Sequence, residues 1–284
     1  MTPELQKKID QAVKLIRLAG ADGETVEVAY SGGKDSDVIL ELTRMAGINY
    51  RAIYKNTTID PPGTIKHVKS KGVEVRNAEQ TFFDLVAKKG WPSRFVRFCC
   101  SELKEYKVLD RSIMGVRKAE SVARMKRYDE PTKCLTYGSK KEYVEAFYPI
   151  LEWSDQDVSD FIKERGIECH PLYYDEKGNF HVERRLGCLC CPLVYRKKRV
   201  EEFKKYPRMI VLYLRAGQKF RDTHPDAAFT KNYNNIYDAF VRFLFYDTDN
   251  DFKQSRNGLF EPIDCKTFLE RYFNINLDPS PMTP

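Results

Sequence analysis

The sequence has no long apolar run, and no stretch approaches the ~20 apolar residues that a membrane-spanning helix requires. It also has no internal repeat and no low-complexity linker, which argues against a repeat array or a flexible tether. At the N-terminus, charged and apolar residues interleave at helical spacing, with Thr2 as the expected N-cap and Pro3 at the first helical position. A signal peptide lacks this pattern, so we expect a cytoplasmic protein with no membrane partner.

Composition points to a globular chain with an anionic partner. The 284 residues are enough for one large domain, or for one domain with an appendage, and 42% of them are hydrophobic. The net charge of +7 fits a polyanionic partner such as a nucleotide or a nucleic acid. Eight cysteines in a reducing cytoplasm indicate metal or redox chemistry more than disulfides.

The first third of the chain alternates between strand and helix patterns. Short apolar runs predict the strands, and apolar residues three and four apart predict the helices between them. The expected order is strand 25–30, helix 35–46, strand 50–54, helix 64–71, strand 73–75 and helix 81–89. This alternation is typical of an α/β fold with a Rossmann-like, doubly wound and mostly parallel sheet.

Beyond Trp91 the chain becomes basic and aromatic, with short elements and little periodicity. One exception is a helix that Ser154 should cap, with Val158, Phe161 and Ile162 facing inward. After about residue 207 the pattern is helical and rich in aromatic residues. We therefore predict a nucleotide-binding domain over residues 1–206 and a helical subdomain over residues 207–284.

The turn after the first strand has the composition of a phosphate-binding loop. It consists of Ser31, Gly32, Gly33, Lys34, Asp35 and Ser36. The N–H groups and dipole of the following helix N-terminus attract anions, and glycines let the backbone approach a phosphate. The two hydroxyls can donate hydrogen bonds, Lys34 can neutralise charge, and Asp35 can hold Mg²⁺ or cap the helix. The spacing differs from both the Walker loop and the dinucleotide-binding pattern.

This loop resembles the PP-loop of the ATP pyrophosphatase superfamily, also called adenine nucleotide α-hydrolase-like. The resemblance implies that ATP binds with Mg²⁺ and is cleaved between its α and β phosphates, with release of pyrophosphate. Asp60 follows the second strand, in a loop that commonly lies over the nucleotide in this fold. Its alternative role is that of a turn former before Pro61.

Most of the cysteines fall in two short clusters far apart in the sequence. Two pairs of thiolates, one adjacent and one with C-x-x-C spacing, can converge into a four-ligand site. Adjacent ligands favour an iron–sulfur cluster over structural zinc. The predicted ligands are Cys99, Cys100, Cys188 and Cys191. Either Cys134 or Cys190 could replace Cys100, whereas Cys169 and Cys265 are expected to be buried structural thiols.

Five segments occur in the order typical of the phosphoadenosine phosphosulfate (PAPS) reductase family, which the chain resembles from about residue 24 to 192. They read CCSELK, GVRKAESVAR, PILEWSDQDV, HPLYYDEKG and GCLCCP. In the iron–sulfur members of this family the CC and C-x-x-C pairs hold a 4Fe–4S cluster, and the resemblance implies the same here. It also implies that Arg117 and Arg124, in the second segment, bind the phosphate or sulfate of a nucleotide.

Two departures from the family pattern bear on the activity. Sulfonucleotide reductases have a degenerate phosphate loop, whereas this chain keeps the full SGGKDS, as do the members that hydrolyse ATP. Those reductases also need a mobile cysteine in a C-terminal tail of the Glu-Cys-Gly-Leu-His type. The last cysteine here is Cys265, in IDCKTFLERYF, with no glycine or histidine beside it. Both departures weaken the reductase interpretation.

The expected function is therefore ATP cleavage at the α–β bond, with an iron–sulfur cluster, in sulfur transfer or nucleic-acid modification. The candidate catalytic residues are Lys34, Asp35, Arg117 and Arg124. The alternatives are a sulfonucleotide reductase that forms sulfite and a non-catalytic nucleotide or iron–sulfur sensor. A nucleic acid or a sulfur carrier is the further partner we consider. The basic stretch 195–208 suits a phosphate backbone, or else forms an amphipathic helix with Val200 and Phe203 inward.

Overall fold

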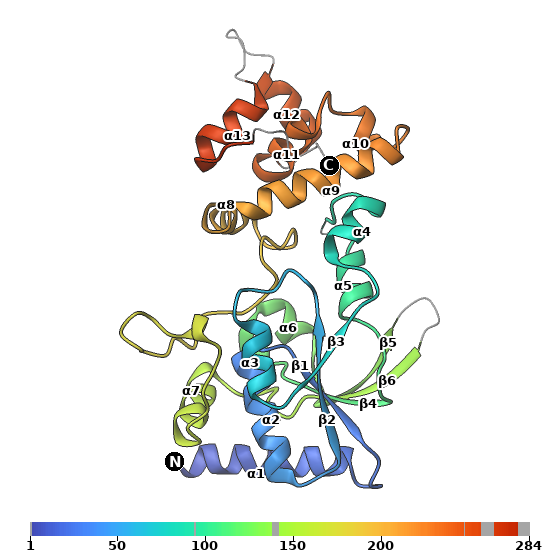
Figure 1. Ribbon diagram of the computed structural model, residues 1–284. Coiled ribbons are helices and arrows are strands. Elements are labelled where there is room, and N and C mark those ends of the chain that lie inside the picture. Colours follow the sequence, from blue (N-terminus) through green and yellow to red (C-terminus); the bar gives the residue numbers. More distant parts are fainter. Residues whose placement is uncertain (1, 94, 138–141, 247, 257–263, 278–284) are drawn as a thin grey trace. The chain divides into compact units, whose positions relative to one another are not determined.

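The computed structural model describes residues 2–93, 95–137, 142–246, 248–256 and 264–277 (Figure 1). The chain forms two compact units, each made of two separate segments. The first unit comprises Met1–Ala78 and Cys100–Gly187, and the second comprises Glu79–Cys99 and Cys188–Pro284. The predicted division after residue 206 falls within the second unit and stays a prediction.

The first unit is built on a six-stranded sheet with the order β3-β2-β1-β4-β6-β5. The strands are β1 (Val26–Tyr30), β2 (Tyr50–Asn56), β3 (Glu74–Asn77), β4 (Arg111–Met114), β5 (Thr132–Tyr137) and β6 (Glu142–Phe147). Neighbouring strands are parallel except that β5 pairs antiparallel with β6. The predicted α/β fold with a mostly parallel sheet is therefore confirmed.

Strand order reverses beside β1, and this reversal positions the site. The chain runs from β1 outward to β2 and β3, then returns to the opposite side of β1 as β4. In open α/β sheets, ligands bind outside the carboxyl ends of the strands at such a switch point. The loops that follow Tyr30 of β1 and Met114 of β4 both begin there.

The main core of the first unit lies on one face of the sheet. Three helices contribute to it, namely α1 (Pro3–Ala19), α2 (Lys34–Ala46) and α7 (Asp155–Glu164). Val26, Val28 and Tyr30 alternate toward this face from β1 because successive strand residues point to opposite sides. As predicted, Thr2 caps α1, and Ser154 caps α7 in a reciprocal capping box with Asp157.

Four short elements complete the first unit. They are α3 (Thr64–Ser70), η1 (Lys118–Glu120), α6 (Val122–Arg127) and η2 (Pro171–Tyr173). A fifth short helix, α5 (Phe98–Leu103), contains the boundary between the units, which falls between Cys99 and Cys100.

The second unit is helical and its core is aromatic. Its helices are α4 (Phe82–Lys89), α8 (Arg196–Lys205), α9 (Arg208–Thr223), α10 (Ala228–Lys231), α11 (Ile236–Phe245), α12 (Asp249–Arg256) and α13 (Cys265–Phe273). Tyr213 of α9 packs against Phe82 and Phe203, with ring centroids 5.6 and 5.2 Å away. The predicted helical C-terminal region is confirmed. No helix in the described ranges is long and apolar enough to cross a membrane.

The capping box of α7 gives a direct test of this local structure. Replacing Ser154 by Ala removes the hydroxyl that accepts from the Asp157 N–H, at 3.1 Å, and should lower the free energy of unfolding by about 1 kcal/mol. Ser159→Ala, at an interior position of the same helix, is the matched control and should be neutral or slightly stabilising. Chemical denaturation of both variants measures the difference, and equal stabilities would contradict the capping assignment.

Candidate functional site

The loop between β1 and α2 forms a turn that only small residues allow. Gly32 has a φ of 79°, in the left-handed region that favours glycine. Gly33 is the N-cap of α2 and has no side chain with which to cap the helix. The Ser36 hydroxyl donates to the Gly33 carbonyl at 2.6 Å, and the Ser31 hydroxyl donates to Ser36 at 3.3 Å. The first turn of α2 thus lies where an anion would meet its N–H groups.

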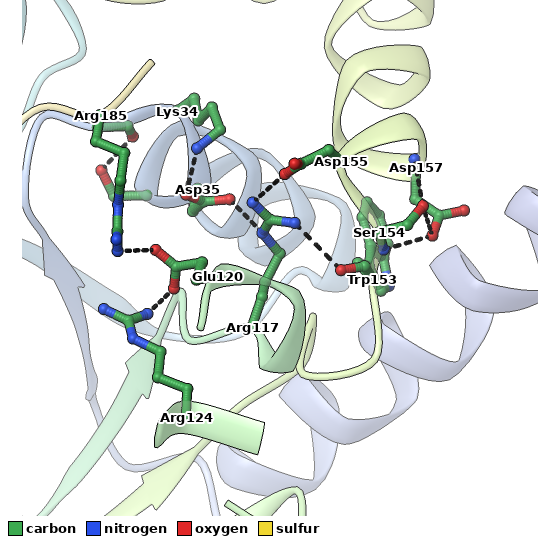
Figure 2. Close-up of polar contacts among 12 residues, drawn as sticks. Lys34, Asp35, Arg117, Glu120, Arg124, Trp153, Ser154, Asp155, Asp157 and Arg185 are labelled. Carbon is green, nitrogen blue, oxygen red and sulfur yellow. Dashed lines mark hydrogen bonds and ion pairs between the residues drawn. The ribbon is translucent and has the colours of Figure 1, made fainter. Parts of the chain in front are cut away.

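A buried ion cluster lies at the start of α2 (Figure 2). The carboxylate of Asp35 accepts from Lys34 Nζ at 3.0 Å with one oxygen and from Arg117 Nε at 2.6 Å with the other. Lys34 is 3% exposed and Arg117 only 1%. The predicted helix-capping role of Asp35 is wrong, because its side chain is held by these two cations instead.

Arg117 is fixed by three different partners. Besides Asp35, it donates to the Trp153 carbonyl at 3.2 Å and to the Asp155 carboxylate at 2.7 Å. Its side chain therefore connects the loop after β4 with the start of α2 and the start of α7 (Figure 2). This arrangement differs from that of a solvated arginine on a helix surface.

Gly115 lets the loop after β4 approach α2 closely. A Cβ at this position would lie 2.9 Å from the Asp35 carbonyl oxygen and 3.0 Å from its carbon. Atoms at that distance overlap, so a side chain would push the two loops apart. The glycine therefore brings Arg117 within reach of Asp35 at the switch point.

Tyr173 and Leu186, both in the second segment of the first unit, lie against the phosphate loop. A Cβ on Gly33 would lie 3.2 Å from the Tyr173 hydroxyl, and one on Gly32 would lie 3.3 Å from Leu186 Cδ2. The Lys34 ammonium lies 5.6 Å from the centroid of the Tyr173 ring. Burial raises the pKa of Tyr173 to about 12, so its hydroxyl stays protonated at neutral pH.

A buried polar network joins α2 to β1 and α3. Asp37 is 3% exposed, accepts a hydrogen bond from the Tyr30 hydroxyl, and lies 3.2 Å from His67 Nε2 through both carboxylate oxygens. The Tyr30 hydroxyl also lies 3.1 Å from the same nitrogen. These contacts attach α3 to α2 and to the end of β1, because His67 comes from α3.

The second predicted arginine, Arg124, belongs to another ion cluster. It pairs with Glu120, and Arg185 donates to the same carboxylate at 2.7 Å (Figure 2). Burial lowers the pKa of Arg124, and the positive charge of Arg185 lowers it further. The two guanidinium groups are thus close enough to repel one another, with one carboxylate between them.

Asp60 has a structural role in the loop after β2. Its Oδ2 accepts from the Tyr54 hydroxyl at 2.5 Å, from the Thr57 N–H at 3.1 Å and from the Thr57 hydroxyl at 2.7 Å. These bonds fit the turn-forming alternative. The contribution of Asp60 to nucleotide binding stays a prediction.

The C-x-x-C segment forms a tight turn within the second unit. Cys190 has a φ of 51°, its N–H donates to Glu202 Oε2 at 2.9 Å, and its carbonyl accepts from the Tyr213 hydroxyl at 2.9 Å. Its thiol is buried, whereas Cys188 and Cys191 are only half-buried. The outer two cysteines of this turn are therefore more accessible than the middle one.

Tyr213 has these cysteines around it. Burial raises its pKa well above the usual value, and Cys190, Cys191, Cys99 and Cys188 raise it further. Cys99, Cys188 and Cys191, three of the four predicted ligands, thus act electrostatically on the same tyrosine of the second unit, while Cys100 belongs to the first unit. Within the described residues, no three His, Cys, Asp or Glu side chains form a group that could hold a metal ion. The iron–sulfur cluster stays a prediction.

The other cysteines lie elsewhere in the two units. Cys134 is exposed on β5, whereas Cys169 is buried and contacts Asp37. Cys265 is buried at the first residue of α13. A buried thiol at this position is a poor candidate for the mobile nucleophile of a reductase.

Sequence reasoning missed several residues of the site. They are Asp37, Glu120, Asp155, Tyr173 and Arg185. Only Asp37 had a local signal, because it directly follows the phosphate loop. The others come from segments that no periodicity connects with α2.

The mostly parallel sheet and the glycine-rich loop at its switch point are features of a nucleotide-binding α/β protein. The family model of the phosphoadenosine phosphosulfate reductase domain matches residues 25–194, which is more than half of the chain. The chain belongs to this family.

Three individual proteins show how similar known sequences and structures are to this chain. An uncharacterized protein of Methanocaldococcus jannaschii is 28% identical over 211 residues, which cover 69% of this chain and 48% of the relative. The tRNA-cytidine(32) 2-sulfurtransferase of Stutzerimonas stutzeri is 34% identical over 109 residues, covering 32% and 40%. The PAPS reductase structure from Candida auris has a TM-score of 0.44 at 12% identity and covers 64% and 97%. The chain spans less than half the length of the first curated relatives it matches.

The close approach at Gly115 can be tested by substitution. Gly115→Ala should move the first turn of α2 and lower the free energy of unfolding by about 1–3 kcal/mol. Gly187→Ala is the control, because a Cβ there meets no atom within 4 Å, and it should change stability by less than about 0.5 kcal/mol. Thermal unfolding of the two variants measures the difference. An unchanged stability in Gly115→Ala would contradict the described contact.

Proposed function

We propose that this protein binds Mg·ATP at Ser31–Ser36 and cleaves it between the α and β phosphates, in sulfur transfer or nucleic-acid modification. The observation that carries the proposal is the buried Lys34–Asp35–Arg117 cluster, at the N-terminus of α2 and at the switch point of the sheet. A helix N-terminus with a lysine at its first position suits a phosphate. The membership of the PAPS reductase family supports a nucleotide as the ligand.

Lys34 is the residue that we expect to contact the phosphates. A phosphate that enters the loop competes with Asp35 for the Lys34 ammonium, and the stronger charge of the phosphate favours the exchange. Asp35 is then the carboxylate that would hold Mg²⁺, which neutralises part of the phosphate charge. Arg117 keeps its bonds to Trp153 and Asp155, so we assign it a positioning role.

The proposed reaction is an in-line transfer at the α phosphorus. A bond forms between an acceptor oxygen and the α phosphorus, and the bond to the bridging oxygen breaks. Pyrophosphate leaves with that electron pair, and the proton of the acceptor passes to solvent. Lys34 and Arg124 stabilise the negative charge that develops on the phosphates.

The cysteines would add a second function to the chain. Cys99, Cys188 and Cys191, three of the four predicted ligands, each raise the pKa of Tyr213, and Cys188 and Cys191 are half-buried, which suits thiolate ligation. The predicted 4Fe–4S cluster would supply an iron to hold or deliver sulfur. Two curated relatives are named as a tRNA sulfurtransferase and a PAPS reductase, and both names involve sulfur chemistry.

A nucleic acid is the acceptor class that the surface favours. Residues Arg196–Lys205 form α8, and Val200 and Phe203 are buried, so the amphipathic-helix alternative is confirmed. The remaining face of α8 is nevertheless basic, with exposed Lys197, Lys204 and Lys205. Such a face can bind a phosphate backbone, and a sulfur carrier with an acidic surface is the other candidate.

The role of Lys34 is tested by pyrophosphate release from Mg·ATP. Lys34→Ala should lower the rate by about 100-fold or more, because it removes the cation that stabilises the developing charge. Lys66→Ala, an exposed lysine on α3, is the matched control and should keep the wild-type rate. Both variants should retain the wild-type circular dichroism spectrum. An unchanged rate in Lys34→Ala would contradict the proposal.

Iron content tests the cysteine assignment on anaerobically purified protein. Cys188→Ser and Cys191→Ser should each lose most of the bound iron and sulfide, because each removes a thiolate ligand. Cys134→Ser should keep the wild-type content, since this exposed residue lies on β5 of the first unit. Loss of iron in Cys134→Ser would show that Cys134 is a ligand in place of one of the predicted cysteines. A wild-type chain without iron would rule the cluster out.

A further inference from the structure

Glu120, Arg124 and Arg185 form a second ion cluster in the first unit. One oxygen of its carboxylate accepts from Arg185 Nη2 at 2.7 Å, and the other pairs with Arg124 (Figure 2). The Glu120 side chain is 9% exposed, whereas Arg124 and Arg185 are 35% and 49% exposed. The buried partner is thus the anion, and the two cations remain accessible from solvent.

Arg185 is carried by the segment that lies against the phosphate loop. The next residue, Leu186, contacts the position of a Cβ on Gly32, and its N–H donates to the Tyr173 hydroxyl at 3.3 Å. The Tyr173 ring in turn faces the ammonium of Lys34. Arg185 is therefore placed beside the loop by the same segment that covers the loop glycines.

The cluster around Glu120 and the one around Asp35 are also electrically coupled. The negative charge of Asp35 raises the pKa of Arg124, whereas the positive charges of Arg185 and Arg117 lower it. These groups therefore lie within electrostatic range of one another. In both clusters, one carboxylate lies between two cations.

Two close guanidinium groups with one carboxylate between them are well suited to a phosphate. Arginine binds phosphate oxygens through its planar fork of N–H groups, and a phosphate carries more charge than a carboxylate. We propose that Arg124 and Arg185 form a second phosphate subsite beside the loop, and that Glu120 occupies it as an internal anion in the free protein. Arg185 is then a binding residue for a ligand phosphate that lies outside the loop. This inference rests on the proposed function, because it assumes that a nucleotide phosphate occupies the loop itself.

The subsite predicts opposite effects for its two partners. Arg185→Gln should weaken binding of Mg·α,β-methylene-ATP by roughly tenfold or more, because it removes a charge-assisted hydrogen bond to phosphate. Glu120→Gln should strengthen binding of the same analogue, since it removes the competing anion. If the ion pair is only structural, both substitutions break it and both weaken binding, together with a lower melting temperature. Isothermal titration calorimetry measures these affinities.

The neighbouring Arg184 provides the matched control. Its guanidinium donates to the Leu172 carbonyl at 3.3 Å and to the Tyr174 carbonyl at 2.7 Å, so it is held by backbone groups and not by Glu120. Arg184→Gln removes the same charge from the adjacent position and should leave the affinity unchanged. Equal losses in Arg184→Gln and Arg185→Gln would reduce the effect to net charge and overturn the subsite.

Failure of the proposed function gives a different result from failure of the subsite. If the wild-type protein does not bind the ATP analogue, the proposed function is wrong, and inorganic pyrophosphate becomes the probe for the same three variants. Opposite signs for Arg185→Gln and Glu120→Gln with pyrophosphate would still support the subsite. Effects of the same sign, or no binding of pyrophosphate, would overturn it.

Discussion

The carboxylate of Asp35 is the contact on which the site depends. Lys34 and Arg117 are both buried, and burying an unpaired charge costs several kcal/mol, so each needs an anion within bonding distance. Asp35 supplies one oxygen to each of them. Through Arg117 the same contact extends to Asp155 at the start of α7. One carboxylate therefore fixes the loop after β1 against the loop after β4.

The first half of the sheet could be predicted because its signals are local. Strands β1 and β2 each contain a short stretch of buried apolar residues, and the glycines after β1 mark the turn into α2. Strands β4 and β6 gave no such signal. Strand β4 has only four residues, two of them polar, and the burial of the six residues of β6 does not alternate regularly. Their place in the sheet comes from tertiary pairing, which periodicity does not encode.

The residues of the site likewise divide into those that a local sequence signal predicts and those that only the fold brings together. Lys34 and Asp35 were predictable because the loop composition itself suits phosphate. Arg117 followed from the family resemblance, yet the residue it pairs with lies 82 positions away. No spacing rule connects Asp35 with Arg117, or Glu120 with Arg185, because an ion pair between distant segments depends on how the loops meet. Arg117 as an anion ligand stays a prediction, and its buried contacts support the positioning role that we propose for it.

The central claim is cleavage of ATP at its α–β bond by the site at the end of β1. Phosphorus NMR of Mg·ATP incubated with anaerobically purified protein, with and without candidate nucleic-acid acceptors, identifies which bond breaks. We expect AMP or an adenylated acceptor together with pyrophosphate. Formation of ADP and phosphate would contradict it, as would intact ATP in every mixture while the same protein converts PAPS or adenylyl sulfate to sulfite.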